Sequence, residues 1–271
     1  MAAENGLFDK TLRVDIQTFQ SAQELTAAMT AGELDLALTD PQVAATLSGA
    51  GTEVALRWIA LGATPAEGRF GIQAGAASGI ASLADLKGKQ IAVGSSTVPE
   101  YVMDRLLGHA GIGLDEIEKV EVKKLPVRFQ MMAAGQVAAA ALPASLIALG
   151  ELEGCRTVAD DTAGENLSQS VIVERLEADG SGALGDALEL VRDGWMRGVD
   201  AVNADPERYR ALLVSAASLP KSLAETYPIP TYPTDAAPTA ELIQPQLDWM
   251  RMKRYLADSL SFDEETGRFT A

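Results

Sequence analysis

Few residues of this chain have the types and spacing that chemistry requires. His109 is the only histidine and Cys155 the only cysteine. A Ser-His-Asp or Cys-His catalytic set would have to use that one imidazole, and metal sites built on two histidines or on several cysteines are excluded within one chain. An intrachain disulfide is impossible as well. The sequence therefore disfavours hydrolases and metalloenzymes, and it indicates neither a metal nor a cofactor.

The candidate binding residues lie where predicted helices start. Ser21 has Glu24 three residues later, the spacing of a capping box, and Asp40 precedes Pro41 at a second start. A third start follows a predicted strand and consists of Gly94, Ser95, Ser96 and Thr97. Free backbone N–H groups and the helix dipole make such starts suitable for a carboxylate, sulfonate or phosphate, although plain helix capping is the alternative at each one.

Arg128 is the most informative charged residue. It follows a predicted strand and lies near the start of a helix, where a cation opposes the helix dipole. An anionic ligand group would explain its position, and the alternative is a surface ion pair with Glu118 or Glu121. Two aromatic residues, Phe19 and Tyr101, could stack on a planar ligand or pack inside the protein.

Short apolar runs alternate with longer helical patterns, which predicts an α/β protein with mostly parallel sheets. The predicted strands are residues 12–16, 34–38, 54–61, 70–73, 90–93, 120–122, 138–142 and 170–174. The predicted helices are residues 21–31, 41–50, 82–86, 99–110, 127–134, 144–152, 185–203, 206–217, 220–227 and 239–258. The last third is predicted to be nearly all helical, with residues 228–233 as an extended, proline-rich tether.

An internal repeat indicates two similar lobes. Residues 29–38 and 132–142 each end a helix at a glycine, Gly32 or Gly135, and continue into an aliphatic strand. The length of 271 residues also favours about two domains. In such sheets ligands bind beyond the carboxyl ends of the strands, so two facing lobes would form a cleft there. The net charge of −16 argues against nucleic acid as a partner.

A glycine motif could indicate a dinucleotide site, and the predicted two-lobed architecture could belong to a regulator. Residues 180–185 spell G-x-G-x-x-G, but the strand context of a dinucleotide site is missing, so a flexible linker is the better interpretation. A cytoplasmic effector-sensing domain would share a two-lobed architecture. No helix-turn-helix segment or basic patch accompanies the predicted lobes, which weakens that alternative.

Several motifs resemble the type II periplasmic substrate-binding proteins of ABC transporters, in the branch for nitrate, sulfonates, taurine and thiamine precursors. The most specific is Ser82–Val93, similar to "sl.DLKGK.IaV". Residues 3–8, 31–35, 109–117 and 249–253 match further motifs of the branch. The resemblance covers nearly the whole chain. It departs at Ala138, where the family carries an aspartate, and at Ala144-Ser145, where an acidic residue and a proline are frequent.

The resemblance implies a two-lobed fold with a helical C-terminal tail, lobe 1 being residues 1–70 and 173–271 and lobe 2 residues 71–172. It also implies a first strand ahead of the residues matching 3–8, which this sequence lacks, as it lacks a signal peptide. The expected function is the solute-binding component of an ABC importer: a periplasmic or extracytoplasmic monomer that closes on a small, anionic solute and contacts a membrane permease. The expected ligand-binding set adds Gln20, Thr39, Pro143, Ala144, Ser168 and Gln169 to the residues above.

Two related enzyme types remain as alternatives: a desulfinase with a cysteine nucleophile, and a thiamine-pyrimidine synthase that consumes its own histidine beside a cysteine-rich motif. Cys155 and His109 match neither pattern. Catalysis is therefore not expected.

Overall fold

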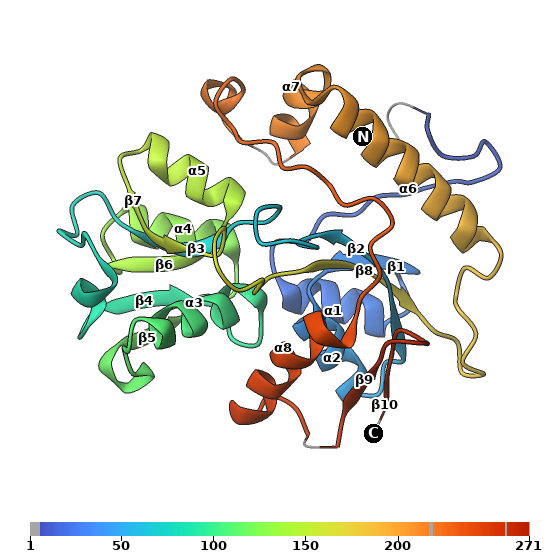
Figure 1. Ribbon diagram of the computed structural model, residues 1–271, viewed down its shortest axis with the longest axis horizontal. Helices are drawn as coiled ribbons and strands as arrows, with labels where there is room; N and C mark the ends of the chain where they lie inside the picture. Colours follow the sequence, from blue (N-terminus) through green and yellow to red (C-terminus); the bar gives the residue numbers. More distant parts are fainter. Residues whose placement is uncertain (1–5, 217–218, 258, 271) are drawn as a thin grey trace.

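The computed structural model describes residues 6–216, 219–257 and 259–270. It contains two five-stranded sheets flanked by helices, side by side along the long axis of the molecule (Figure 1). The strands are β1 (Leu36–Thr39), β2 (Val54–Leu61), β3 (Phe70–Ala74), β4 (Gln90–Val93), β5 (Glu118–Glu121), β6 (Ala139–Pro143), β7 (Arg156–Asp160), β8 (Ser170–Arg175), β9 (Ser261–Asp263) and β10 (Arg268–Thr270). The α-helices are α1 (Ala22–Thr30), α2 (Pro41–Gly49), α3 (Val98–His109), α4 (Leu125–Ala133), α5 (Ala144–Leu152), α6 (Ala187–Ala204), α7 (Pro206–Ala216) and α8 (Ala240–Met252).

Three short 3₁₀ helices complete the described elements: η1 (Leu83–Leu86), η2 (Leu114–Glu116) and η3 (Lys221–Leu223). The α/β class and the two-lobed architecture predicted from the sequence are confirmed. We call the body around β1, β8, β2, β10 and β9 the first lobe, and the body around β5, β4, β6, β3 and β7 the second lobe. No helix in the described ranges is both long and apolar enough to cross a membrane.

The sheet of the first lobe corrects the expectation of mostly parallel strands. Its order is β1-β8-β2-β10-β9, and every pairing is antiparallel. The strands β1 and β2 run in the same direction, because α2 connects them as a crossover. The strand β8 returns from the second lobe, lies between these two and runs opposite to both. Because β8 lies between β1 and β2, these two strands do not pair with each other. Local sequence patterns do not encode such a long-range return of the chain.

The second lobe has a mixed sheet. Its strands β5, β4 and β6 pair in parallel, as the βαβ pattern predicts. The strand β3 pairs antiparallel with both β6 and β7, because it brings the chain in from the first lobe. The helices α3 and α4 both start beyond the carboxyl ends of parallel strands, α3 after β4 and α4 after β5. That edge is where the ligand cleft was expected.

Several predicted elements change. Residues 12–16 form no strand, because the described part of the chain offers them no ladder partner; Ile16 is 71% exposed. The C-terminal third is not all helical, since β9 and β10 form a hairpin that extends the first sheet. The predicted helix 220–227 reduces to η3, and α8 ends at Met252. Residues 217 and 258, where two of the predicted helices end, lie outside the described residues.

The internal repeat is present in the structure. The helix α1 leads through Gly32 to β1, and α4 leads through Gly135 to β6. Both glycines have left-handed backbone angles, with φ of 72° and 68°. This conformation is open to glycine at little cost and ends the helix before the strand.

The helix α3 joins the two lobes. Its residues Val98, Tyr101 and Val102 belong to the apolar core of the first lobe, whereas Met103 and Leu107 belong to that of the second. Its polar residues also contact the first lobe.

A charged cluster secures the contact between α3 and α8. Lys253 Nζ lies 3.2 Å from Glu100 and 3.1 Å from Asp104, and Lys119 Nζ contacts the same two carboxylates at 2.9 and 2.6 Å. The Trp249 indole N–H donates to Asp104 at 3.1 Å. Burial opposes ionisation of Glu100, but its bond to Lys119 leaves the pKa of Glu100 below the usual value. Each buried carboxylate therefore has cations from both lobes.

The two chain crossovers between the lobes are bonded to each other. The Asn166 amide donates to the carbonyls of Gly62 and Ala63 at 2.9 and 3.1 Å. Asp161 is 2% exposed and accepts the Phe70 N–H at 2.7 Å and the Ser168 hydroxyl. Burial raises the pKa of Asp161 to about 6, although both donors favour its charged form.

Candidate functional site

A cavity of about 680 Å³ lies between the two lobes, at the carboxyl ends of β1, β5 and β6. Its volume falls within the range of about 300–1,000 Å³ that is usual for small-molecule sites. The first lobe contributes residues 14–22, the end of β1 and parts of β2, β8 and α6. The second lobe contributes the starts of α3 and α4 and the end of β6. Such a cavity can hold a ligand that touches both lobes.

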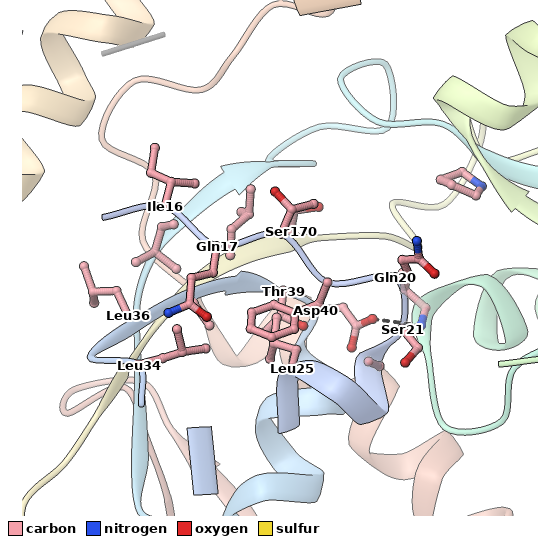
Figure 2. Close-up of a pocket in the computed structure, with 18 of the residues that line it drawn as sticks. Ile16, Gln17, Gln20, Ser21, Leu25, Leu34, Leu36, Thr39, Asp40 and Ser170 are labelled. Atoms are coloured by element: carbon pink, nitrogen blue, oxygen red, sulfur yellow. Dashed lines mark hydrogen bonds between the residues drawn. The ribbon is translucent and has the colours of Figure 1, made fainter. Parts of the chain in front are cut away.

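The cavity is apolar on one side and polar on the other. Figure 2 shows Ile16, Leu34 and Leu36 gathered at one end, whereas Gln20, Ser21 and Asp40 lie toward the other. The apolar side continues to Trp58 and Trp195, whose rings are 6.3 Å apart. The polar side faces the helix starts of the second lobe. A ligand with a polar or charged head would therefore place that head between the lobes.

Two helix starts of the first lobe are capped as predicted. The Ser21 hydroxyl accepts the Glu24 N–H at 3.2 Å as the N-cap of α1. The Glu24 carboxylate accepts the N–H of Gln20 at 3.0 Å and not that of Ser21, so only half of the predicted capping box is formed. Asp40 accepts the Val43 N–H at 2.8 Å as the N-cap of α2. Both capping residues line the cavity.

The start of α3 differs from what the sequence predicted. Its backbone donors are already bonded to carboxylates of this protein: Ser95 N–H to Glu121, Ser96 N–H to Glu100 and Val98 N–H to Asp40, at 3.1, 2.9 and 3.3 Å. Asp40 alone among these three acceptors comes from the first lobe. The Thr97 hydroxyl donates to the Gly94 carbonyl at 2.7 Å. Three backbone donors of this start are therefore taken by carboxylates of the protein, which leaves it less open to an anion than the sequence predicted.

Arg128 in α4 differs from the start of α3, because part of its hydrogen-bonding capacity is unused among the described residues. Its side chain is only 2% exposed, yet it lines the cavity. Its Nε donates to the Val122 carbonyl at 3.0 Å and its Nη1 to the Ala141 carbonyl at 2.9 Å. Within the described residues no carboxylate forms an ion pair with it, so the surface pair with Glu118 or Glu121 is not made, and Nη2 has no hydrogen-bond acceptor.

Burial lowers the pKa of Arg128 to about 10, so the guanidinium stays protonated at neutral pH. A buried charge without a partner is costly to the folded protein. An anion in the cavity would supply the missing charge and an acceptor for Nη2.

Eight of the fifteen predicted site residues line this cavity. They are Phe19, Gln20, Ser21, Thr39, Asp40, Thr97, Arg128 and Pro143. Gly94 does not line it, but a side chain at this position would overlap Nη2 of Arg128, so the missing Cβ makes room for the guanidinium. Ser95, Ser96 and Ala144 lie outside the lining.

The remaining predicted residues have structural positions. Tyr101 is 1% exposed and its ring packs edge-on against Trp249 at 5.3 Å, so it is not available to stack on a ligand, which corrects that expectation. Ser168 donates to Asp161 at the crossover. The Gln169 amide donates to the Gly62 carbonyl at 3.3 Å. Ser168 and Gln169 thus lie at the crossover and outside the cavity lining.

Two further residues of the lining, Lys123 and Ser170, were not predicted from the sequence. Lys123 is exposed and lines the cavity five residues before Arg128, and Ser170 begins β8 at the cavity wall. The pair Lys123-Lys124, directly after a predicted strand, was a usable signal. The charged side chains of the lining are Asp15, Asp40, Lys123 and Arg128, and Asp15 is held by Arg13 at 3.1 Å.

The single cysteine and the single histidine lie away from this cavity. Cys155 follows α5 and is buried, and burial raises the pKa of its thiol. The His109 side chain is 53% exposed, and its Nε2 is 3.4 Å from Glu165. In the described ranges, no group of three or more His, Cys, Asp or Glu side chains is arranged to hold a metal ion.

Comparisons with known proteins bear on this site. The model of the NMT1/THI5-like family matches residues 1–170. The alkanesulfonate-binding protein SsuA of Xanthomonas axonopodis pv. citri, bound to MOPS, has a similar structure, with a TM-score of 0.79 at 20% identity over 95% of this chain and 89% of that one. The periplasmic aliphatic sulphonate-binding protein SsuA of Escherichia coli gives 0.71 at 20% identity, over 89% and 82%.

The fold also supports catalysis in other proteins. The desulfurization enzyme DszB is similar to this chain with a TM-score of 0.67 at 16% identity, over 94% of this chain and 88% of that one. The sequence has no significant match among curated proteins.

Proposed function

We propose that this chain, which belongs to the NMT1/THI5-like family, is the solute-binding component of an ABC importer. It captures a small organic or inorganic anion between its lobes. The observation that carries the proposal is Arg128, a buried guanidinium without a carboxylate partner in the described structure, lining a cavity shared by both lobes. The similarity to sulfonate-binding proteins supports the same ligand class.

Binding follows from closure of two lobes. The ligand's anionic group accepts hydrogen bonds from Arg128, and the rest of the ligand contacts the first lobe near Gln20, Ser21 and Thr39. A ligand that touches both lobes shifts the equilibrium between open and closed forms toward the closed form. We place the lobe boundaries near residues 70 and 172, where Asp161 and Ser168 bond the two crossovers. A membrane permease then recognises the closed monomer outside the cytoplasm.

Catalysis is the second candidate, because DszB shares the fold. A desulfinase or a pyrimidine synthase of this fold needs a cysteine or a histidine at the ligand. In the described part of the chain neither residue type lines the cavity. We therefore favour binding without chemical change.

A thermal-shift screen of the purified chain tests the proposal. The panel contains sulfonates, nitrate, carboxylates, amino acids and thiamine-related pyrimidines, and each hit is recovered and analysed by mass spectrometry. A ligand at about 100 times its Kd adds about 2.7 kcal/mol to the free energy of unfolding, which raises Tm by several degrees. An anion recovered unchanged supports the proposal. An anion recovered chemically altered supports the enzyme alternative, and a panel without any anionic hit contradicts the proposed ligand class.

A further inference from the structure

The start of α3 is occupied by a carboxylate from the opposite lobe. Asp40 Oδ2 accepts the Val98 N–H at 3.3 Å, and Val98 is the first residue of α3. The next residue, Pro99, has no N–H, and the N–H groups of Glu100 and Tyr101 bond to the Thr97 carbonyl. Val98 is therefore the one backbone donor in the first turn of α3 that the second lobe leaves for an outside acceptor.

The same carboxylate lines the cavity that holds Arg128. An anion bound at Arg128 shares a cavity of about 680 Å³ with Asp40, and like charges in one cavity repel each other. The anion would also compete for the Val98 N–H, which points at the position where a helix start favours negative charge.

Only Asp40 can be exchanged in this way. Glu100 and Glu121, the other acceptors at this start, belong to the second lobe, as the start of α3 does. Asp40 comes from the first lobe, as does Thr46, whose Oγ1 lies 3.3 Å from Ser96 Oγ. The bond between Asp40 and Val98 thus joins the two lobes at the cavity, and an anion that takes the Val98 N–H must replace it.

From these contacts we infer that Asp40 is an internal competitor for the anion and sets the affinity of the site. This inference rests on the proposed anion-binding function. It makes Asp40 an affinity-determining residue that opposes the ligand, in contrast to Arg128, which attracts it. Loss of the negative charge at Asp40 should then tighten anion binding.

The test is the variant Asp40→Asn, titrated calorimetrically with ethanesulfonate, inorganic sulfate and acetate. Asparagine keeps an oxygen for the Val43 N–H and is as good an N-cap as aspartate, so α2 stays intact. Its amide carries no charge and can donate to an anion. We expect the Kd of the best probe to fall about tenfold, as for a removed charge contact. Asp40→Ser, a shorter N-cap, should change the Kd in the same direction.

The matched control is Asp205→Asn. Asp205 is an exposed aspartate that accepts the Arg208 N–H at 3.2 Å in the first turn of α7, away from the cavity, so its replacement should leave the Kd unchanged. An unchanged or raised Kd in both Asp40 variants, with wild-type binding that still depends on Arg128, overturns the inference alone. Absence of binding by wild type and both variants overturns the proposed function as well.

Discussion

The starts of α3 and α4 follow two neighbouring parallel strands, β4 and β5, and both looked like anion sites in the sequence. At α3 the N–H groups of Ser95, Ser96 and Val98 have acceptors from the protein: the carboxylates of Glu121, Glu100 and Asp40. At α4 the buried Arg128 has two carbonyls and no carboxylate partner within the described residues.

The difference shows that a helix start alone does not locate a ligand. Free N–H groups are a property of every helix start, and proteins satisfy most of them internally. A buried cation that the fold leaves without an ion-pair partner is rarer, because its desolvation is poorly compensated. The second feature therefore locates the ligand better than the first.

The largest expected effect comes from Arg128→Met, which keeps the length of the side chain and removes the charge. Loss of a charge-assisted hydrogen bond should weaken anion binding by about 2–3 kcal/mol, or roughly a hundredfold. Calorimetric titration with the best anion of the screen measures the change. Arg156→Met, at an exposed position of β7 outside the cavity lining, is the control and should bind as wild type does.

An unchanged Kd in Arg128→Met would remove Arg128 from the site. The variant loses a buried charge without an ion-pair partner, which favours stability, and the hydrogen bonds to the Val122 and Ala141 carbonyls, which opposes it. Its free energy of unfolding is therefore measured beside its Kd. A folded variant that binds the anion as wild type does would contradict the proposed role of Arg128.

At the crossovers, Asp161 is a second buried charged group: it accepts two hydrogen bonds and, like Arg128, forms no ion pair with the described residues. Its pKa is raised by burial from 3.8 to about 6, so the folded state holds the proton more tightly than the unfolded chain. This contribution to stability is fully present below about pH 4 and is lost as pH rises through about 6. At about 1.4 kcal/mol per pKa unit, the loss amounts to about 2–3 kcal/mol.

Asp161→Asn should abolish this pH dependence, since an amide can accept the Phe70 N–H and donate to Ser168 without a charge. Urea unfolding between about pH 4 and pH 7 measures it: the stability of the variant relative to wild type should rise with pH. Parallel curves for the two proteins would show that Asp161 does not titrate in this range.

A smaller effect is expected where the two helix starts meet. A Cβ at Gly94 would overlap Nη2 of Arg128, so Gly94→Ala should displace the guanidinium and weaken anion binding by roughly tenfold, as for a partly lost charged hydrogen bond. Gly108→Ala, in α3 with nothing within 4 Å of the added carbon, is the matched control. Equal affinities in both variants would mean that the position of Nη2 does not matter.

The sequence predicted those parts of the fold that depend on local pattern. The glycine turns at Gly32 and Gly135 and the N-caps at Ser21 and Asp40 are all present, because each is fixed by residues within one or two turns. The antiparallel first sheet and the hairpin of β9 and β10 escaped prediction, because they depend on where distant segments return.

The sequence likewise predicted only part of the cavity lining. Arg128, which lines the cavity, was predicted to bind the ligand because a cation at a helix start conflicts with the dipole, a conflict visible in the sequence. Tyr101 was assigned to the ligand because nothing local shows that Trp249, far along the chain, packs against its ring. The carboxylates that fill the start of α3 come from three separate segments, so only the folded chain shows that this start is occupied.

The most direct measurement is a crystal structure of the protein with bromoethanesulfonate, whose bromine can be located by anomalous scattering. Binding at Arg128 predicts a sulfonate oxygen within hydrogen-bond distance, about 3 Å, of Nη2, with the bromine inside the cavity between the lobes. A sulfonate ordered elsewhere, with Arg128 still lacking an anionic partner, would contradict the central claim.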